Sequence, residues 1–286
     1  MEKLLKEYET YLNNSNLSES TIKGYLNDVK KFTEYSSENK LDIFMCRQFD
    51  VKKYFDYIKK SNVTDFTVYR NLSSIKNFYN FLQKSKYIKE VPINKMKISN
   101  RNKPVPKYIE KRVFDRIISE TDEKTEKGIR DRCILYLMFY CGLKATETTE
   151  LKLNNINISL NILSINTVTG FRVVHLNDSI KELLRNYLKT IRPNLIYKST
   201  QPNENVFLNL SGNPISRQGV WKIIKYYSKL AGVKEKINPN IIRNSFAIYS
   251  LQNGITPKQL KELLGYNDSS TIRAYTEIVK NTAVKL

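Results

Sequence analysis

Apolar side chains recur every three or four residues through residues 4–82, and this spacing restricts the segment to helices. One run ends near Leu12, and the next follows Ser18, a residue type that often caps a helix N-terminus. Asp50 and Thr64 precede two further runs and are candidate caps of a third and a fourth helix. No alternation of apolar and polar residues, which would indicate strands, interrupts these runs. The segment therefore predicts a compact four-helix module.

A stretch with two prolines and no helical period separates this module from the rest of the chain. Residues 94–108 also carry five basic residues and no acidic one. Such a composition is typical of a linker, either an ordinary tether or a strap that lies along phosphates. The length of 286 residues suits two domains. We therefore predict a helical domain at 1–93, a basic linker at 94–108 and a second domain at 109–286.

The second domain is expected to combine helices with a small amount of strand. The apolar run Ile129–Tyr140, closed by Gly142, predicts a buried helix. Asn161–Asn166 and Arg172–Leu176 flank a short turn and predict a β-hairpin. Thr256 is a candidate N-cap for a late helix that starts with proline and ends at a glycine. Further helical runs are expected at Phe114–Ile118, Leu183–Ile191, Val220–Leu230 and Pro257–Gly265.

Charge points to a polyanionic partner. Lysine and arginine total 48 against 28 acidic residues, which gives a net charge of +20. Such a field favours nucleic acid, although a merely basic soluble protein is the alternative. No run of eighteen apolar residues and no signal-type segment is present, so a membrane partner is not expected. We expect a cytoplasmic protein associated with the nucleoid.

The cysteines and the single histidine limit the possible chemistry. Cys46, Cys133 and Cys141 are odd in number and lack CxxC spacing, so reduced thiols are expected instead of disulfides or a zinc site. His175 alone cannot form a histidine metal cluster, and it makes a Ser-His or Cys-His mechanism improbable. We therefore expect neither a metal nor a cofactor.

Two residues near the C-terminus are suited to phosphate chemistry. Arg243 precedes apolar residues on a predicted helix and is a candidate for a buried anion-binding group, the alternative being a surface or ion-paired arginine. Tyr275 is a candidate nucleophile, the alternative being a core tyrosine packed with Ile272 and Ile278. An arginine that holds a phosphate and a tyrosine that attacks it would together cleave a phosphodiester.

Several blocks, in order and over nearly the whole chain, resemble the tyrosine recombinases. The residues that carry the resemblance are Leu17–Tyr25, Arg130–Leu137, Cys141–Glu147, Asn240–Ala247, Leu263–Tyr266 and Tyr275–Thr276. The resemblance implies a mainly α protein. It implies an N-terminal, SAM-like four-helix core-binding domain and a C-terminal α+β catalytic domain with a small β-hairpin.

The resemblance also implies site-specific DNA recombination, meaning integration, excision or resolution, through a 3′-phosphotyrosyl intermediate. It places Tyr275 at the nucleophile and Arg243 at the second catalytic arginine. Lys144 stands at the position of the first arginine and keeps the charge without the bidentate fork. Asn240 and Tyr266 stand where histidines are usual. These five residues are the expected catalytic set.

Two further positions depart from the family pattern. Gly170 stands where a hairpin lysine is expected, and no lysine lies between Leu160 and Ile180. Asn244 replaces another histidine. An amide cannot donate a proton near neutral pH as histidine can. A catalytically impaired accessory or regulatory protein of the same fold is therefore the alternative function.

The implied partners are double-stranded DNA and further protomers, in a homo- or hetero-tetramer on two DNA sites. Sequence alone does not distinguish an integrase of a mobile element from a chromosomal resolvase. A helix-turn-helix regulator over Pro257–Ile278 is a third possibility, but it leaves the N-terminal module unexplained. The expected DNA contacts are Lys23, Lys76, Arg101, Lys103, Lys107 and Arg172.

Overall fold

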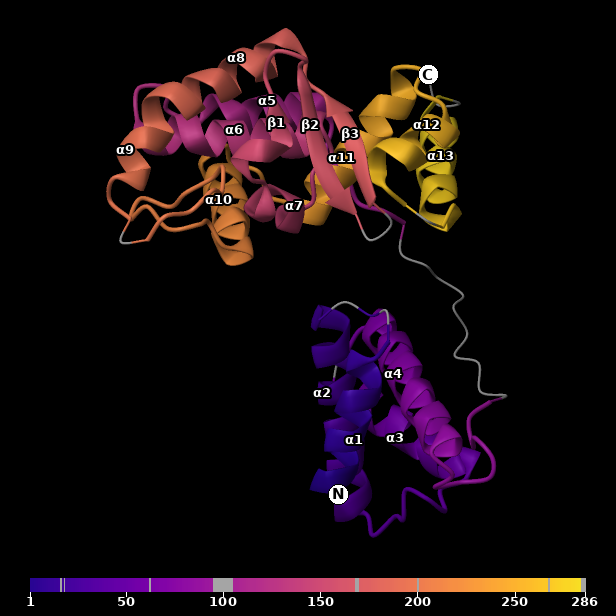
Figure 1. The fold of residues 1–286 in the computed structure, drawn as a ribbon. Coiled ribbons are helices and arrows are strands. Elements are labelled where there is room, and N and C mark those ends of the chain that lie inside the picture. Colours follow the sequence, from indigo (N-terminus) through magenta and orange to yellow (C-terminus); the bar gives the residue numbers. More distant parts are fainter. Residues whose placement is uncertain are drawn as a thin grey trace. The chain divides into compact units, whose positions relative to one another are not determined.

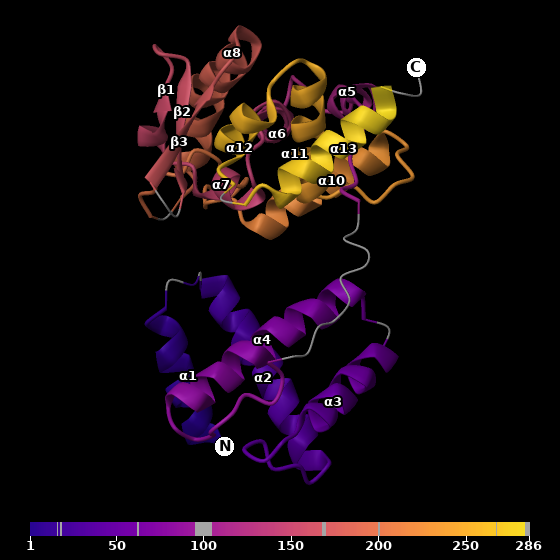
Figure 2. The ribbon, with the colours of Figure 1, turned by 90° about the vertical axis from the view of Figure 1, so that its right-hand side faces the viewer.

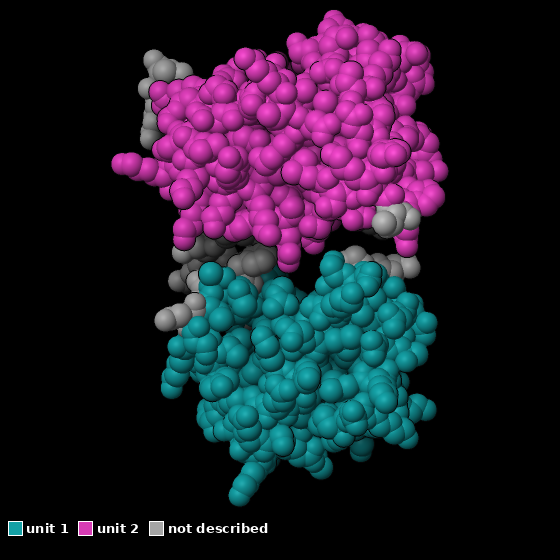
Figure 3. Space-filling model, turned by 90° about the vertical axis from the view of Figure 1, so that its left-hand side faces the viewer, with its two compact units in different colours: residues 1–104 teal, residues 105–286 magenta. Residues whose placement is uncertain are grey.

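The computed structural model describes residues 1–15, 17, 19–61, 63–94, 105–167, 170–199, 201–266 and 268–283. The chain divides into two compact units, Met1–Pro104 and Val105–Leu286, which are coloured separately in Figure 3. Most of the expected linker, 94–108, lies outside the described residues. Within the described part, no helix has the length and apolar content needed to cross a membrane.

The first unit is built from helices, as predicted. They are α1 (Glu2–Asn13), α2 (Glu19–Glu38), α3 (Gln48–Lys60) and α4 (Asp65–Lys84) (Figure 1). Thr64 caps α4 as expected, because its Oγ1 accepts a hydrogen bond from the backbone N–H of Thr67 at 3.3 Å. The expected cap Ser18 lies outside the described residues.

Asp50 is not the cap of α3, and that prediction was wrong. The helix begins at Gln48, after the N-cap residue Arg47. The Asp50 carboxylate reaches back from the first turn and accepts the backbone N–H of Arg47 at 3.0 Å. An aspartate near a helix start therefore marks the first turn as readily as the cap, because both positions neutralise unpaired N–H groups.

A buried carboxylate ties α2 to α4 inside the first unit. Asp28 is fully buried and accepts hydrogen bonds from Arg70, from Asn71 at 3.1 Å and from Ser74 at 2.7 Å. The aromatic core around it includes edge-on contact between Phe32 and Tyr54. Asp28 is thus a saturated polar centre within an apolar core, as burial of a charge requires.

The second unit is mainly helical. Its elements are α5 (Lys111–Ser119), α6 (Glu126–Tyr140), α7 (Ala145–Glu150), a 3-10 turn η1 (Leu153–Asn155), α8 (Asp178–Asn186), a π-helical turn η2 (Tyr187–Ile191), α9 (Arg192–Ile196), α10 (Arg217–Leu230), α11 (Pro239–Gln252), α12 (Pro257–Leu264) and α13 (Ser270–Ala283). The predicted helix at Ile129–Tyr140 is confirmed as α6, which is buried along most of its length.

The second unit also contains a small antiparallel sheet. Strands β1 (Ile156–Asn157), β2 (Ile162–Thr167) and β3 (Gly170–His175) lie in that order, with Thr167 opposite Gly170 at the turn. The predicted hairpin is confirmed as β2 and β3. Strand β1 was not predicted, because two residues are too few to show alternation.

The arginine-aspartate block of α6 has an architectural role. Asp131 is fully buried and accepts the Arg130 guanidinium at 2.6 Å and the Tyr227 hydroxyl at 3.1 Å. Arg130 also donates to the Leu208 carbonyl at 3.1 Å. The block therefore fastens α6 to α10 and to the loop before it.

Helices α11, α12 and α13 form one packed group at the end of the chain (Figure 2). Their shared core contains Phe246, Leu260, Leu264, Ile272 and Tyr275. The prediction for α12 is confirmed: the Thr256 side chain caps it, proline follows, and the chain leaves at a glycine with φ +63°. This packing brings the C-terminal tyrosine against the helix that carries Arg243.

Candidate active site

Helix α11 places Arg243 inside the second unit. The residue is 3% exposed. One terminal nitrogen donates to the Gly142 carbonyl and, at 3.2 Å, to Oε2 of Glu147, and the other donates to the Leu264 carbonyl at 2.6 Å. Gly142 has φ +61°, and a side chain there would overlap the Phe246 ring. A glycine is needed at this turn so that its carbonyl can reach the guanidinium.

Glu147 joins a second buried arginine to the first. Arg172, on β3, is 7% exposed and donates to Oε2 of Glu147 at 2.7 Å and to the Leu263 carbonyl at 2.7 Å. Burial lowers the pKa of Arg172, neighbouring Arg243 lowers it further, and Glu147 opposes the shift. The ordinary value is so high that the guanidinium stays charged.

The cluster carries more positive than negative charge. Lys144, at the start of α7, donates its backbone N–H to Glu147 at 2.8 Å and places its ammonium 3.7 Å from Oε1. One carboxylate thus faces Lys144, Arg172 and Arg243. The Nε groups of both arginines are buried and have no hydrogen-bond partner among the described residues. A cluster with excess positive charge and unpaired N–H donors is suited to binding an anion.

Gly265 allows Arg172 to reach this cluster. The glycine ends α12 in the left-handed conformation. A Cβ atom at this position would lie 3.2 Å from Cδ of Arg172 and 3.4 Å from Cγ2 of Thr167. The same residue therefore satisfies the helix end and leaves room for the arginine.

Tyr275 lies deep beside the cluster. It is 1% exposed, and its hydroxyl donates to Oδ1 of Asn244 at 2.7 Å. Burial raises the pKa of Tyr275, Tyr266 raises it further, and Arg243 lowers it. The phenol is therefore neutral near pH 7, and its proton must be removed as it attacks.

The Tyr266 ring also packs on the cation cluster. Its centre lies 5.3 Å from the guanidinium carbon of Arg243. This distance allows an attractive cation–π contact. Tyr266 thus adds a cation–π contact to the hydrogen bonds and the ion pair that hold Arg243.

A separate hollow of 710 Å³ collects the remaining predicted catalytic residues. Lys144 and Asn240 line it together with Arg217 and Trp221. Asn240 is exposed there, whereas Arg243 on the next turn of α11 is buried. Lys144 therefore belongs to both the Glu147 cluster and the hollow. Its backbone N–H and its ammonium face Glu147, and the residue also lines the hollow.

The residues expected to contact DNA lie in different settings. Lys23 is exposed and pairs with Glu19 at 2.6 Å, and Lys76 is exposed on α4. Lys107 is exposed, and its carbonyl accepts the Asn244 amide at 2.8 Å. Arg172 is buried beside Glu147 instead of at the surface. Arg101 and Lys103 lie outside the described residues. The DNA-binding roles of these residues stay predictions.

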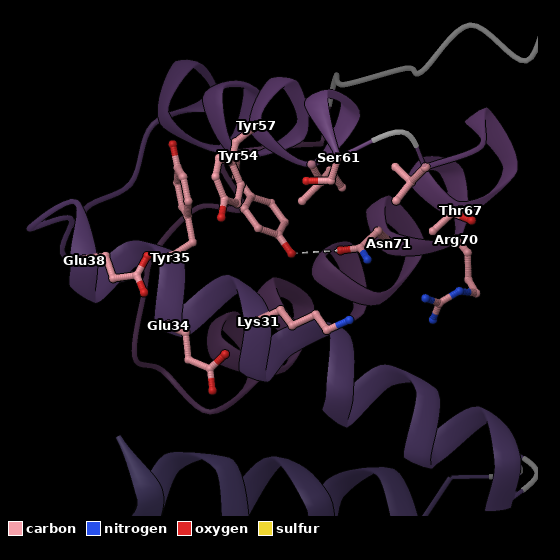
Figure 4. Close-up of a pocket in the computed structure, with 12 residues that line it drawn as sticks. Lys31, Glu34, Tyr35, Glu38, Tyr54, Tyr57, Ser61, Thr67, Arg70 and Asn71 are labelled. Carbon is pink, nitrogen blue, oxygen red and sulfur yellow. Dashed lines mark hydrogen bonds between the residues drawn. The ribbon is translucent and has the colours of Figure 1, made fainter.

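A second hollow, of 280 Å³, lies among α2, α3 and α4 of the first unit (Figure 4). Lys31 and Arg70 line it together with Glu34 and Glu38. The Tyr54 hydroxyl inside it is paired with the Asn71 amide at 3.3 Å. Charges of both signs balance there, so this hollow does not select for an anion.

Sequence reasoning missed Glu147 as a site residue. Glu147 stands three residues after the N-cap residue Lys144, a spacing typical of an acid in the first helical turn that accepts the N-cap N–H. That signal says nothing about arginines that lie 25 and 96 residues away. Among the described residues, no three His, Cys, Asp or Glu side chains gather closely enough to hold a metal ion.

Comparison with known proteins places the chain in a class. Residues 107–282 match the phage integrase family, and residues 5–86 match the phage integrase N-terminal SAM-like domain. The tyrosine recombinase XerD of Staphylococcus epidermidis is 29% identical over 293 residues, covering 100% of this chain and 97% of the relative. XerD of Staphylococcus aureus is 30% identical over 290 residues, with the same coverage. The chain belongs to the phage integrase family of tyrosine recombinases.

Solved structures share the fold. The XerH site-specific recombinase bound to palindromic difH substrate has a TM-score of 0.77 at 16% identity, covering 99% of this chain and 92% of that one. The lambda integrase (75–356) dimer bound to a COC′ core site has a TM-score of 0.73 at 15% identity, covering 96% and 94%. The expected mainly α fold, with a SAM-like N-terminal domain and a C-terminal catalytic-type domain, is confirmed.

Proposed function

We propose that this protein is a site-specific DNA recombinase that cuts and rejoins double-stranded DNA through a 3′-phosphotyrosyl bond to Tyr275. The observation that carries the proposal is the buried pair Arg172 and Arg243, which shares one carboxylate and has two Nε groups without a hydrogen-bond partner in the part of the chain that the structure describes. Such a pair is suited to one phosphodiester anion. The phenol of Tyr275 lies close enough to Arg243 for its charge to oppose the rise in the pKa of Tyr275 that burial causes.

The proposed step balances without a cofactor. The Tyr275 oxygen attacks phosphorus, the bond from phosphorus to the 5′ oxygen breaks, and the phenolic proton leaves as the 5′ oxygen gains one. Arg172 and Arg243 stabilise the nonbridging oxygens as charge moves onto them. Lys144 and Asn240 line the hollow beside this pair, and we assign them to hydrogen bonding with the same phosphate. Reversal of the step by another 5′-hydroxyl rejoins the strands.

The set departs from the family pattern at the hairpin. The described part of β2 and β3 carries no lysine, and Gly170 has open space where a Cβ would be. The leaving oxygen must therefore obtain its proton from another group or from water. Because general acid catalysis contributes about 10²–10⁴-fold, slower strand cleavage is expected than with the full set.

A trapping experiment tests the proposal. A duplex that carries the recognition site, nicked just 3′ of the scissile phosphate, should accumulate a covalent complex because the short strand diffuses away. Tyr275→Phe should bind the duplex equally and form no covalent complex. Wild-type protein that shifts the duplex in a gel and traps nothing would favour the accessory alternative.

The proposed partner is double-stranded DNA, bound by a homo- or hetero-tetramer that joins two sites. The net charge of +20 supports a large electrostatic contribution to binding. If roughly 6–10 phosphates are contacted, affinity should fall about 10³–10⁵-fold between about 50 and 200 mM salt. Fluorescence anisotropy over that range measures the slope, and an affinity that ignores salt would contradict this mode of binding.

A further inference from the structure

We propose that Asn244 is the positioning residue for the Tyr275 nucleophile, and that the end of the linker in turn positions Asn244. This inference rests on the proposed function, since it assigns a role around the same tyrosine. Asn244 accepts the Tyr275 hydroxyl at 2.7 Å through Oδ1 and donates to the Lys107 carbonyl at 2.8 Å through Nδ2. Both ends of one amide are therefore used.

Residues 107–109 are hydrogen-bonded to two consecutive residues of α11, Asn244 and Ser245. Beside the bond from Asn244 to Lys107, the backbone N–H of Ile109 donates to the Ser245 hydroxyl at 2.9 Å. Ser245 is 1% exposed and donates in turn to the Ile241 carbonyl at 2.8 Å. A displacement of residues 107–109 is therefore transmitted directly to the side chain that holds the nucleophile.

The chemistry of the amide explains why this position can do both tasks. Asn244 offers an acceptor and a donor on opposite sides of one planar group. Its oxygen accepts the hydrogen bond from the phenol and so orients Tyr275 until it attacks. Arg243 and Tyr266 are the other groups that act on this phenol, the first lowering and the second raising the pKa of Tyr275. Tyr266 also forms a hydrogen bond with this phenol. Asn244 is the partner that joins the phenol to the Lys107 carbonyl.

Substitutions at Asn244 separate the two hydrogen bonds. Neutral histidine offers an acceptor and a donor on its two ring nitrogens and can replace both. Aspartate keeps the acceptor toward Tyr275 but faces the Lys107 carbonyl with an oxygen, and leucine keeps neither. Single-turnover cleavage of the nicked duplex, with all protein bound, should fall in the order Asn244→His, Asn244→Asp, Asn244→Leu. The leucine variant should be about 10²-fold slower than wild type, because a nucleophile misplaced by about 1 Å loses that much rate.

A pH profile distinguishes positioning from a purely structural role. Below about pH 6.5 the new histidine gains a proton and both of its nitrogens become donors, so it can no longer accept from Tyr275. Cleavage by Asn244→His should then drop at acidic pH relative to wild type, whose amide does not titrate. Identical profiles for the two proteins, or wild-type cleavage by Asn244→Leu, would overturn the proposal.

The hydrogen bond can also be measured without catalysis. With ¹³Cζ-labelled tyrosine, the Tyr275 signal is identified by its loss in Tyr275→Phe. This signal should shift in Asn244→Leu. It should also shift in Ser245→Ala, because the bond from Ile109 to Ser245 that fixes residues 107–109 is lost. Melting temperatures report that both variants remain folded. No shift in either variant overturns the positioning relay even if DNA is cleaved. Shifts in both, together with no cleavage by wild type, support the relay and refute the proposed function instead.

Discussion

Each unit holds a carboxylate that accepts hydrogen bonds from at least one arginine, and the two carboxylates, Asp28 and Glu147, are satisfied differently. Asp28 in the first unit accepts hydrogen bonds from Arg70, Asn71 and Ser74, and the donors around it match its oxygens. Glu147 in the second unit faces Arg172 and Arg243, whose Nε groups remain unpaired among the described residues. The hydrogen bonds around Asp28 are complete, whereas the arginines around Glu147 have N–H donors that could bind a further anion.

The number of hydrogen bonds left unmade distinguishes a structural buried charge from a functional one. A buried charge that is fully hydrogen-bonded holds a unique arrangement of helices but has nothing left with which to bind. A buried cation pair with a shared counterion is held in place and keeps part of its charge free. Such preorganised donors are what stabilise charge as it moves in a transition state.

The largest expected difference lies in catalysis. Arg243→Gln should slow single-turnover cleavage about 10²–10³-fold, or about 3–4 kcal/mol in barrier, because one transition-state donor and its charge are lost. Arg70→Gln is the matched control: it removes a cation from the Asp28 cluster and should leave the rate of prebound complex unchanged. Equal slowing by both variants would show that the contrast between the two clusters is wrong.

Much of the fold could be predicted from the sequence, because local signals determine it. The apolar period gave α1 to α4 and α6, and Thr256 with Gly265 gave both ends of α12. Strand β1 was missed and the role of Asp50 was misplaced, both for physical reasons. Strand β1 is stabilised by pairing with β2 and has no period of its own, and Asp50 serves the start of α3 from inside the helix.

The site could be predicted only in part, because its contacts link distant segments. Motifs gave Arg243 and Tyr275, but no local pattern places Arg172 on Glu147 or Asn244 on Tyr275. Arg172 was expected to contact DNA, and it lies buried in the cation cluster. Long-range packing of β3 and α12 against α11 makes that arrangement, and a single sequence does not reveal it.

The next effect is on stability. Asp28→Ala leaves buried Asn71 and Ser74 without their acceptor and should destabilise the first unit by about 3 kcal/mol. Glu147→Gln also removes a buried counterion, but it leaves a cation pair that an external anion can neutralise. Urea unfolding followed by circular dichroism, with and without cognate duplex, measures both.

The duplex should raise the stability of Glu147→Gln by more than it raises that of Asp28→Ala, because Asp28→Ala keeps the Glu147 carboxylate that competes with an external anion for the Arg172–Arg243 cluster. Inorganic sulfate is a simpler probe of the same difference. Equal stabilisation of the two variants would mean that loss of the Glu147 charge does not strengthen anion binding by the Arg172–Arg243 cluster.

The smallest expected effect is a loss of unfolding free energy at alkaline pH, and it concerns the buried tyrosines Tyr54 and Tyr275. Burial raises the pKa of both tyrosines; Asp28 raises that of Tyr54 further while Arg70 opposes the rise, and Arg243 opposes the rise for Tyr275. A raised folded-state pKa favours the neutral phenol, so its contribution is complete below the unfolded value of about 10 and is lost as pH rises above it. At about pH 10.5 each such tyrosine should cost about 0.8 kcal/mol of unfolding free energy. Tyr54→Phe should remove that share of the pH-dependent loss measured between about pH 9 and pH 10.5, and a loss unchanged by the substitution would show that Tyr54 ionises as readily folded as unfolded.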